Sequence, residues 1–152
     1  MNTLDWIYSR CEDSQHIVTP RDVIDMLQFA RANQFTMAQQ SRTSIKEIMG
    51  PTSLKYGYQK MSERKVETYL QAEYPALWTH YISKFKNART VHTRESLVEL
   101  LGTADGKVVT TLEEVGFLRF VSTTNHYTVP ALYRHGMGLI RGAAGRAQVL
   151  AH

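Results

Sequence analysis

Apolar side chains in the first part of the chain recur with the spacing of helices. Residues 4, 7, 8 and 11 lie three or four positions apart, which predicts one helical face before a polar break at residues 12–15. Thr19, Pro20 and Asp22 then form a helix-start signal. Threonine can cap, proline fits the first helical position, and a carboxylate three residues after the cap can reach back. This second helix is predicted to reach about Gln40.

Further helical segments are predicted up to residue 85. A short one covers residues 43–50 and a longer one about 53–73. Proline disfavours helical conformation in the residue before it, so we place a break at Tyr74-Pro75. Another amphipathic helix carries Leu77, Trp78, Tyr81, Ile82 and Phe85. Residues 1–86 are therefore predicted to form a helical domain that folds alone, and the polar segment 86–92 a connector.

Residues 93–134 follow a different pattern, two short helices and a hairpin. Thr93 is the expected N-cap and Gly102 the stop of the first helix, and a second helix at about 107–115 ends at Gly116. Two β-rich runs, 117–121 and 126–130, flank a polar tip and predict a hairpin. This order is that of a winged helix, a helix-turn-helix variant that mostly binds nucleic acid or protein.

The expected fold class is thus mainly α, a helical bundle followed by a small winged helix with a β-hairpin wing. Residues 135–152 are predicted to be a basic Gly/Ala-rich tail. At 152 residues and 43% hydrophobic, the chain can bury a sizeable core.

Charge is distributed unevenly. Residues 1–83 carry nine Lys or Arg and nine Asp or Glu, whereas residues 84–152 carry nine and five, so the net charge of +4 lies in the second part. This asymmetry is consistent with an anionic partner and equally with a mildly basic solvated surface. The side chains expected to contact nucleic acid or a protein partner are Arg94, Arg119, Arg134, Arg141 and Arg146.

The motifs of common catalytic sites are missing. The chain has no GxxxxGK[ST] loop, no CxxC pair and no HExxH, and its six histidines lack metal-ligand spacing. The single cysteine, Cys11, lies on an apolar helical face and is expected in the core. One cysteine cannot form an internal disulfide, and no signal peptide or membrane span is recognisable, so a cytoplasmic protein is expected. We expect no enzyme activity, no cofactor and no metal.

Three segments carry a resemblance to a known family. Residues 18–27, VTPRDVIDML, resemble the lid-helix region of AAA+/STAND-type P-loop ATPases, where a helix opening with a Pro-Arg pair follows the nucleotide-binding core. Residues 115–118, VGFL, and 129–134, VPALYR, look like the wing and exit of the C-terminal winged helix that many of these ATPases carry. The chain is therefore similar to the C-terminal half of a bacterial P-loop ATPase.

This resemblance implies a role for Arg21. In the family, the arginine of the lid motif can contact nucleotide phosphates, which here would require an ATPase core joined to this chain. The core is missing from the sequence, so ATP hydrolysis by the chain alone is not expected. Without the resemblance, Arg21 is simply a first-turn residue of a helix.

The partner can be protein or DNA. Glu113 and Glu114 on the second helix of the predicted winged helix would be repelled by phosphates, so sequence-specific groove reading is not expected. Apolar and aromatic residues of the helical part favour contact with an ATPase core or another protein subunit. The favoured function is a non-enzymatic, protein-contacting lid and winged helix of a P-loop ATPase. The alternative is a winged helix, free-standing or ATPase-associated, that binds nucleic acid non-specifically; no membrane partner is expected.

Overall fold

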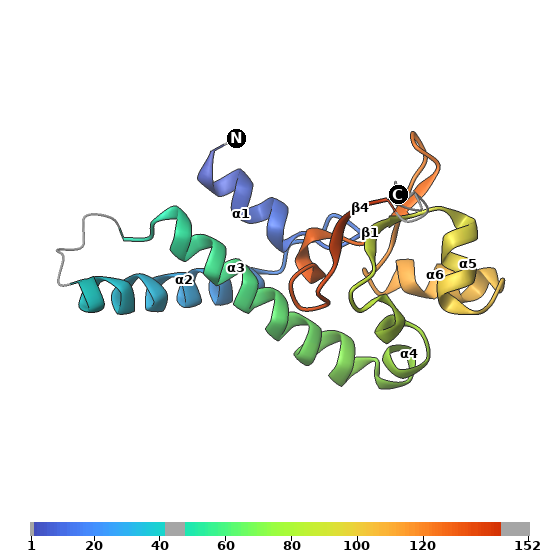
Figure 1. Ribbon diagram of the computed structural model, residues 1–152, viewed down its shortest axis with the longest axis horizontal. Coiled ribbons are helices and arrows are strands. Elements are labelled where there is room, and N and C mark those ends of the chain that lie inside the picture. Colours follow the sequence, from blue (N-terminus) through green and yellow to red (C-terminus); the bar gives the residue numbers. More distant parts are fainter. Residues whose placement is uncertain (1, 42–47, 144–152) are drawn as a thin grey trace, which may run out of the picture.

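The computed structural model describes residues 2–41 and 48–143, which form a mainly helical protein with one four-stranded sheet (Figure 1). Helices α1 (Thr3–Cys11), α2 (Pro20–Ser41) and α3 (Pro51–Lys65) come first. Helices α2 and α3 run side by side toward one end of the molecule, and α5 and α6 lie at the other end. Within the described ranges, no helix has the length and apolar character needed to cross a membrane.

The start of α2 is as the sequence predicts. The helix begins at Pro20, and the Thr19 hydroxyl donates a hydrogen bond to the Asp22 carboxylate. Asp22 is buried, and its charge is paired with Lys65 of α3, whose Nζ lies 2.9 Å from Asp22 Oδ2. A buried carboxylate needs such a partner, so this ion pair fixes the start of α2 against the end of α3.

A helix is present over the predicted residues 53–73, but it changes from an α-helix to a π-helix along its length. Helix α3 passes into a π-helical segment, η1 (Val66–Gln71), which buries Val66 and Leu70, and the chain breaks at Tyr74-Pro75 as predicted. The next predicted helix is wrong as one continuous element. It divides at Tyr81, where φ is −133°, into α4 (Pro75–His80) and the 3-10 helix η2 (Ile82–Phe85).

The short helix predicted over 43–50 falls mostly on residues 42–47, outside the described residues. The remaining residues of that prediction, 48–50, are not helical.

The prediction of a polar connector over residues 86–92 is wrong for its second half. Residues Arg89–His92 form strand β1, which pairs antiparallel with β3 and parallel with β4. Its polar side chains are buried because they find partners. Thr90 Oγ1 accepts a hydrogen bond from the backbone N–H of Gly142 (3.1 Å), and His92 Nε2 bonds to the Arg89 carbonyl (2.7 Å). Burial also lowers the pKa of His92.

The two helices and the hairpin after β1 are confirmed. Thr93 caps α5 (Arg94–Leu101), Gly102 ends it in the left-handed conformation, and α6 (Gly106–Glu114) follows. Strands β2 (Arg119–Val121) and β3 (His126–Thr128) form the hairpin. With the pairings of β1, the strand order of the sheet is β2-β3-β1-β4.

The prediction of a tail over 135–152 is wrong for residues 135–143. After the 3-10 helix η3 (Ala131–Tyr133), Met137 and Leu139 are buried, and β4 (Ile140–Ala143) joins the sheet beside β1. Local sequence gave no sign of this, because a parallel partner strand lies about fifty residues away and the segment is rich in glycine. The rest of the predicted tail, with Arg146, lies outside the described residues.

One hydrophobic core runs through both parts of the chain. The Phe117 ring lies 5.1 Å from Phe85 and 5.5 Å from Tyr133, measured between centroids. Tyr58 of α3 donates a hydrogen bond to the Ala131 carbonyl (2.6 Å). Buried side chains from α1 through Leu139 belong to the same cluster. These contacts lead us to expect one cooperative unit in place of the two independent halves that the sequence suggested.

The close contact between α3 and α2 at Gly57 leads to a prediction about stability. A Cβ added at Gly57 of α3 would lie 2.3 Å from the Met26 carbonyl oxygen and 2.9 Å from the Ala30 Cβ of α2. The resulting overpacking outweighs the ~1 kcal/mol that alanine gains over glycine in a helix. We expect Gly57→Ala to lower the free energy of unfolding by about 2 kcal/mol in urea denaturation. Gly106→Ala is the matched control, because its Cβ would meet open space; equal stability of both variants would contradict the close approach.

Candidate functional site

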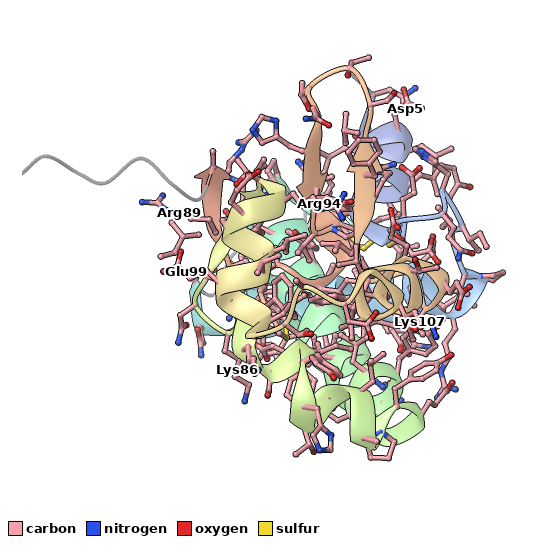
Figure 2. All side chains as sticks on the ribbon, turned by 90° about the vertical axis from the view of Figure 1, so that its right-hand side faces the viewer. Asp5, Lys86, Arg89, Arg94, Glu99 and Lys107 are labelled. Atoms are coloured by element: carbon pink, nitrogen blue, oxygen red, sulfur yellow. The ribbon has the colours of Figure 1, made fainter. Side chains whose placement is uncertain are left out.

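A groove runs along the end of the molecule formed by α5, α6 and the hairpin, which faces the viewer in Figure 2. It consists of two adjoining cavities of about 390 and 210 Å³ that share Arg94 and Tyr127. Phe120 and His126 line the larger cavity, and Val98 lines the smaller one. We call these two cavities the hairpin groove.

The walls of the hairpin groove are held by local structure. Arg94 is the first residue of α5, directly after its cap. Phe120 and Tyr127 are cross-strand partners in the hairpin, and their ring centroids lie 5.1 Å apart. The backbone N–H of Phe120 donates a hydrogen bond to Glu113 Oε1 (3.1 Å), so this carboxylate oxygen already has a partner within the protein. The groove therefore offers aromatic surface, one arginine and the carboxylate of Glu95, which suits docking of another molecule.

The exposed face of α6 carries few groups able to read DNA bases. Lys107, Thr110, Thr111 and Glu114 are exposed and follow helical spacing. Both threonine hydroxyls donate to carbonyls of their own helix, at 3.1 Å to Gly106 and 2.9 Å to Lys107. One ammonium and one carboxylate remain, which agrees with the expectation that α6 does not read sequence.

Arg119, the predicted contact residue of the wing, is engaged inside the protein. It is half-buried in β2, and its Nη1 donates to Nε2 of His16 in the loop between α1 and α2 (2.7 Å). With Nε2 accepting, the other ring nitrogen of His16 donates to the Glu12 carboxylate, which lies in contact with it. Arg119 thus joins the hairpin to the loop after α1 and is not a free cation on the wing.

The other predicted arginines lie on separate elements, so the structure does not gather them into one site. Arg21 is exposed on the first turn of α2, and Arg141 is exposed on β4. Arg134 directly follows η3, and its charge acts on Tyr58 of α3. Arg94 alone lines the hairpin groove, and Arg146 lies outside the described residues.

Cys11 belongs to the core, as expected. Its side chain is fully buried, and its Sγ lies 3.9 Å from the Met26 Sδ. Burial, with the nearby Asp22 charge, raises the pKa of the thiol to about 12. A nucleophilic cysteine needs a lowered pKa, so Cys11 is not suited to catalysis. Within residues 2–41 and 48–143, no group of three or more His, Cys, Asp or Glu side chains could hold a metal ion.

Sequence reasoning missed the aromatic part of the groove. Phe120 and Tyr127 were assigned to a hairpin, but the pairing of an exposed Phe120 ring with a half-buried Tyr127 ring follows from the register across the turn. It also missed a second group, on α1 and α3, in which Trp6, Arg10 and Tyr58 meet His135. The only local signal was the helical i, i+4 spacing of Trp6 and Arg10.

Comparison with protein-family models, curated proteins and solved structures found no match.

The environment of Cys11 predicts its reactivity. We expect the native protein to react with Ellman's reagent at pH 7.5 at least a hundredfold more slowly than the urea-unfolded chain, because the thiol is buried and its thiolate strongly disfavoured. The rate is measured by absorbance of the released thiolate, with Cys11→Ala as the blank. Rapid stoichiometric reaction of the folded protein would show that Cys11 is accessible and would reopen a catalytic role.

Proposed function

We propose that the segment from β1 to β3 is a winged helix and that the chain is a non-enzymatic module that contacts another protein. The order strand, helix, helix, hairpin, with β3 between β1 and β2, supports the winged-helix assignment. The hairpin groove at this end of the molecule, lined by Arg94, Phe120 and Tyr127, supports the binding role.

The protein-contact proposal is carried by one observation, the placement of exposed apolar side chains. Among the described residues, only Val98, Phe120 and Ile140 of the exposed large hydrophobics lie in the second part of the chain. The others belong to the first 56 residues: Leu4, Tyr8, Ile17, Ile24, Phe35, Met37, Ile48 and Tyr56. Exposed apolar side chains that gather on a surface are typical of a protein contact area.

A continuous stripe on α2 is the best-defined part of this area. Arg21, Ile24, Gln28, Arg31 and Phe35 follow helical spacing, on the side of α2 opposite the buried positions 22, 26 and 30. Ile24 is 52% exposed and Phe35 48% exposed, although α2 is packed along its other side. We call these five residues the α2 stripe. Its mixture of apolar side chains and arginines matches the composition of protein interfaces.

The resemblance to P-loop ATPases supplies a partner for the α2 stripe. We propose that the stripe packs on a nucleotide-binding core, with Arg21 at the end nearest the nucleotide phosphates. The core is either encoded upstream of Met1 in the native reading frame or supplied by a separate chain. A GxxxxGK[ST] loop in that upstream sequence would support the first arrangement.

Non-specific nucleic-acid binding is the second candidate, and one observation favours it. Lys86, Arg94 and Lys107 are exposed and Arg89 is half-buried; they are spread over the end of the molecule seen in Figure 2, with Glu99 between Arg89 and Lys86 in that view. Binding through these side chains would reach phosphates and would be sensitive to salt but not to sequence.

The two candidates predict different responses to substitution. We expect Ile24→Ser with Phe35→Ser to leave the circular dichroism and melting temperature nearly unchanged, because both side chains are exposed, and to weaken binding to the P-loop core at least tenfold. Binding is measured by isothermal titration calorimetry with the purified core.

Val98→Ser is the matched control, since Val98 is an exposed apolar residue on α5. Unchanged core affinity in the double variant would overturn the α2 stripe as the contact. Fluorescence anisotropy with two unrelated duplexes tests the alternative. Salt-sensitive binding to both, lost in Lys86→Gln with Arg94→Gln, together with no core binding, would establish it instead.

A further inference from the structure

Two arginines, a histidine and two aromatic rings meet where α1, α3 and the turn after η3 come together. The guanidinium carbon of Arg10 lies 5.4 Å from the Trp6 ring centroid and 5.8 Å from that of Tyr58. The His135 ring packs on the same tyrosine, with centroids 4.7 Å apart and planes at 78°. Arg134 precedes His135 and is close enough to act electrostatically on both Tyr58 and His135. We call this group the arginine–aromatic cluster.

The positive charge of the cluster is not neutralised within the described part of the chain. By comparison, two lysines of α3 form ion pairs. Lys60 Nζ lies 2.7 Å from Glu63 Oε2, and Lys65 Nζ lies 2.9 Å from Asp22 Oδ2. Arg10 and Arg134 form none among the described residues, and Arg134 Nε is buried without an acceptor there.

The carboxylate that acts electrostatically on His135 is already engaged. Glu63 acts on His135, but it accepts hydrogen bonds from Lys60 (2.7 Å) and Gln59 (3.0 Å). These charges affect the pKa of the His135 imidazole. Partial burial lowers the pKa of His135, the Arg134 charge lowers it further, and Arg10 adds to this, while Glu63 opposes it. An anion placed between the arginines would act in the opposite direction and raise this pKa.

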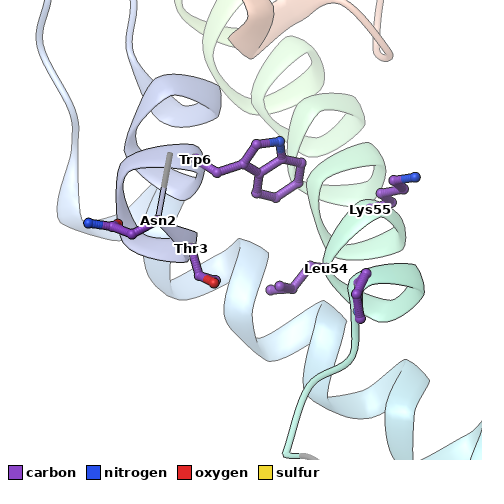
Figure 3. Close-up of a pocket in the computed structure, with 6 residues that line it drawn as sticks. Asn2, Thr3, Trp6, Leu54 and Lys55 are labelled. Atoms are coloured by element: carbon purple, nitrogen blue, oxygen red, sulfur yellow. The ribbon is translucent and has the colours of Figure 1, made fainter.

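A cavity of about 270 Å³ shares Trp6 with the cluster, and Figure 3 shows the residues that line it. It lies between the N-terminal ends of α1 and α3, is mostly apolar, and is lined by Asn2, Thr3, Trp6, Pro51, Leu54 and Lys55. Thr3, Trp6 and Arg10 lie on one face of α1, at i, i+3 and i+7, so the cavity and the cluster follow each other along the helix. Trp6 belongs to both.

We propose that Arg10, Arg134 and His135 bind the phosphate group of a monoester whose apolar or aromatic part lies in the cavity beside Trp6. A phosphate monoester carries a charge of about −1.5 to −2 at neutral pH and three acceptor oxygens, which matches two guanidinium forks and an imidazole. A carboxylate carries one charge and is satisfied by a single arginine fork. The site uses no residue of the α2 stripe. A negative result for phosphate binding would therefore leave the proposed protein contact unaffected, and a negative result for the protein contact would leave the phosphate site unaffected.

Nuclear magnetic resonance on the full chain tests the proposal. Inorganic phosphate, phenyl phosphate and benzoate are titrated at constant ionic strength, and the signals of the His135 ring and the Trp6 indole are followed. We expect saturable shifts with both phosphates and at least fivefold tighter binding of phenyl phosphate. The His135 pKa should rise in the phosphate complex. Benzoate, which has a similar shape and a single charge, should not saturate the site.

Matched variants separate the site from general charge effects. Arg10→Gln should weaken phosphate binding at least tenfold. Arg64→Gln is the control, because Arg64 is also an arginine of this helical part but pairs with Asp25 (3.4 Å), and should change nothing. Leu54→Ala should remove the advantage of phenyl phosphate and leave inorganic phosphate unaffected. Non-saturating shifts, equal effects of the two arginine variants, or equal affinity for both phosphates in the unmodified protein would overturn the proposal.

Discussion

Helix α3 approaches its neighbours so closely on two sides that only glycine fits at the contacts. On one side a Cβ at Gly57 would lie 2.3 Å from a carbonyl oxygen of α2. On the other, a Cβ at Gly136, in the turn after η3, would lie 2.6 Å from the Ser62 carbonyl oxygen and 2.6 Å from Val66 Cγ2. The Gly136 backbone N–H also donates to Ser62 Oγ (3.0 Å). Helix α3 therefore packs against α2 on one side and against the chain leading to β4 on the other, which joins all three in one packed unit.

The proposed binding surfaces follow from this arrangement. Because α2 is packed along α3 through Met26 and Ala30, its opposite side, the α2 stripe, is left in solvent. The turn at Gly136 places Arg134 and His135 beside Tyr58 of α3, and α1 brings Arg10 to the same ring. The two surfaces lie on different elements, one suited to protein contact and the other to a phosphate group.

Features that depend on neighbouring residues were predictable from sequence. The cap at Thr93, the stop at Gly102 and the hairpin tip depend on short-range chemistry, and all three are present. Strands β1 and β4 were missed because their pairing is long-range and their sequences are polar or glycine-rich. For the same reason Arg134 was grouped with the wing arginines as a contact for nucleic acid or a partner, although its charge acts on Tyr58 of α3. Arg10 was missed as a site residue altogether.

The claim that α3 unites the chain is tested most directly by native-state hydrogen exchange in low concentrations of urea. If one core includes both parts, the slowest-exchanging amides of α3 and of β1 should open with the same free energy and the same dependence on urea. Opening of β1, α5 and α6 at a lower free energy, while α2 and α3 remain protected, would contradict the account. It would show instead two independent units divided near residue 86.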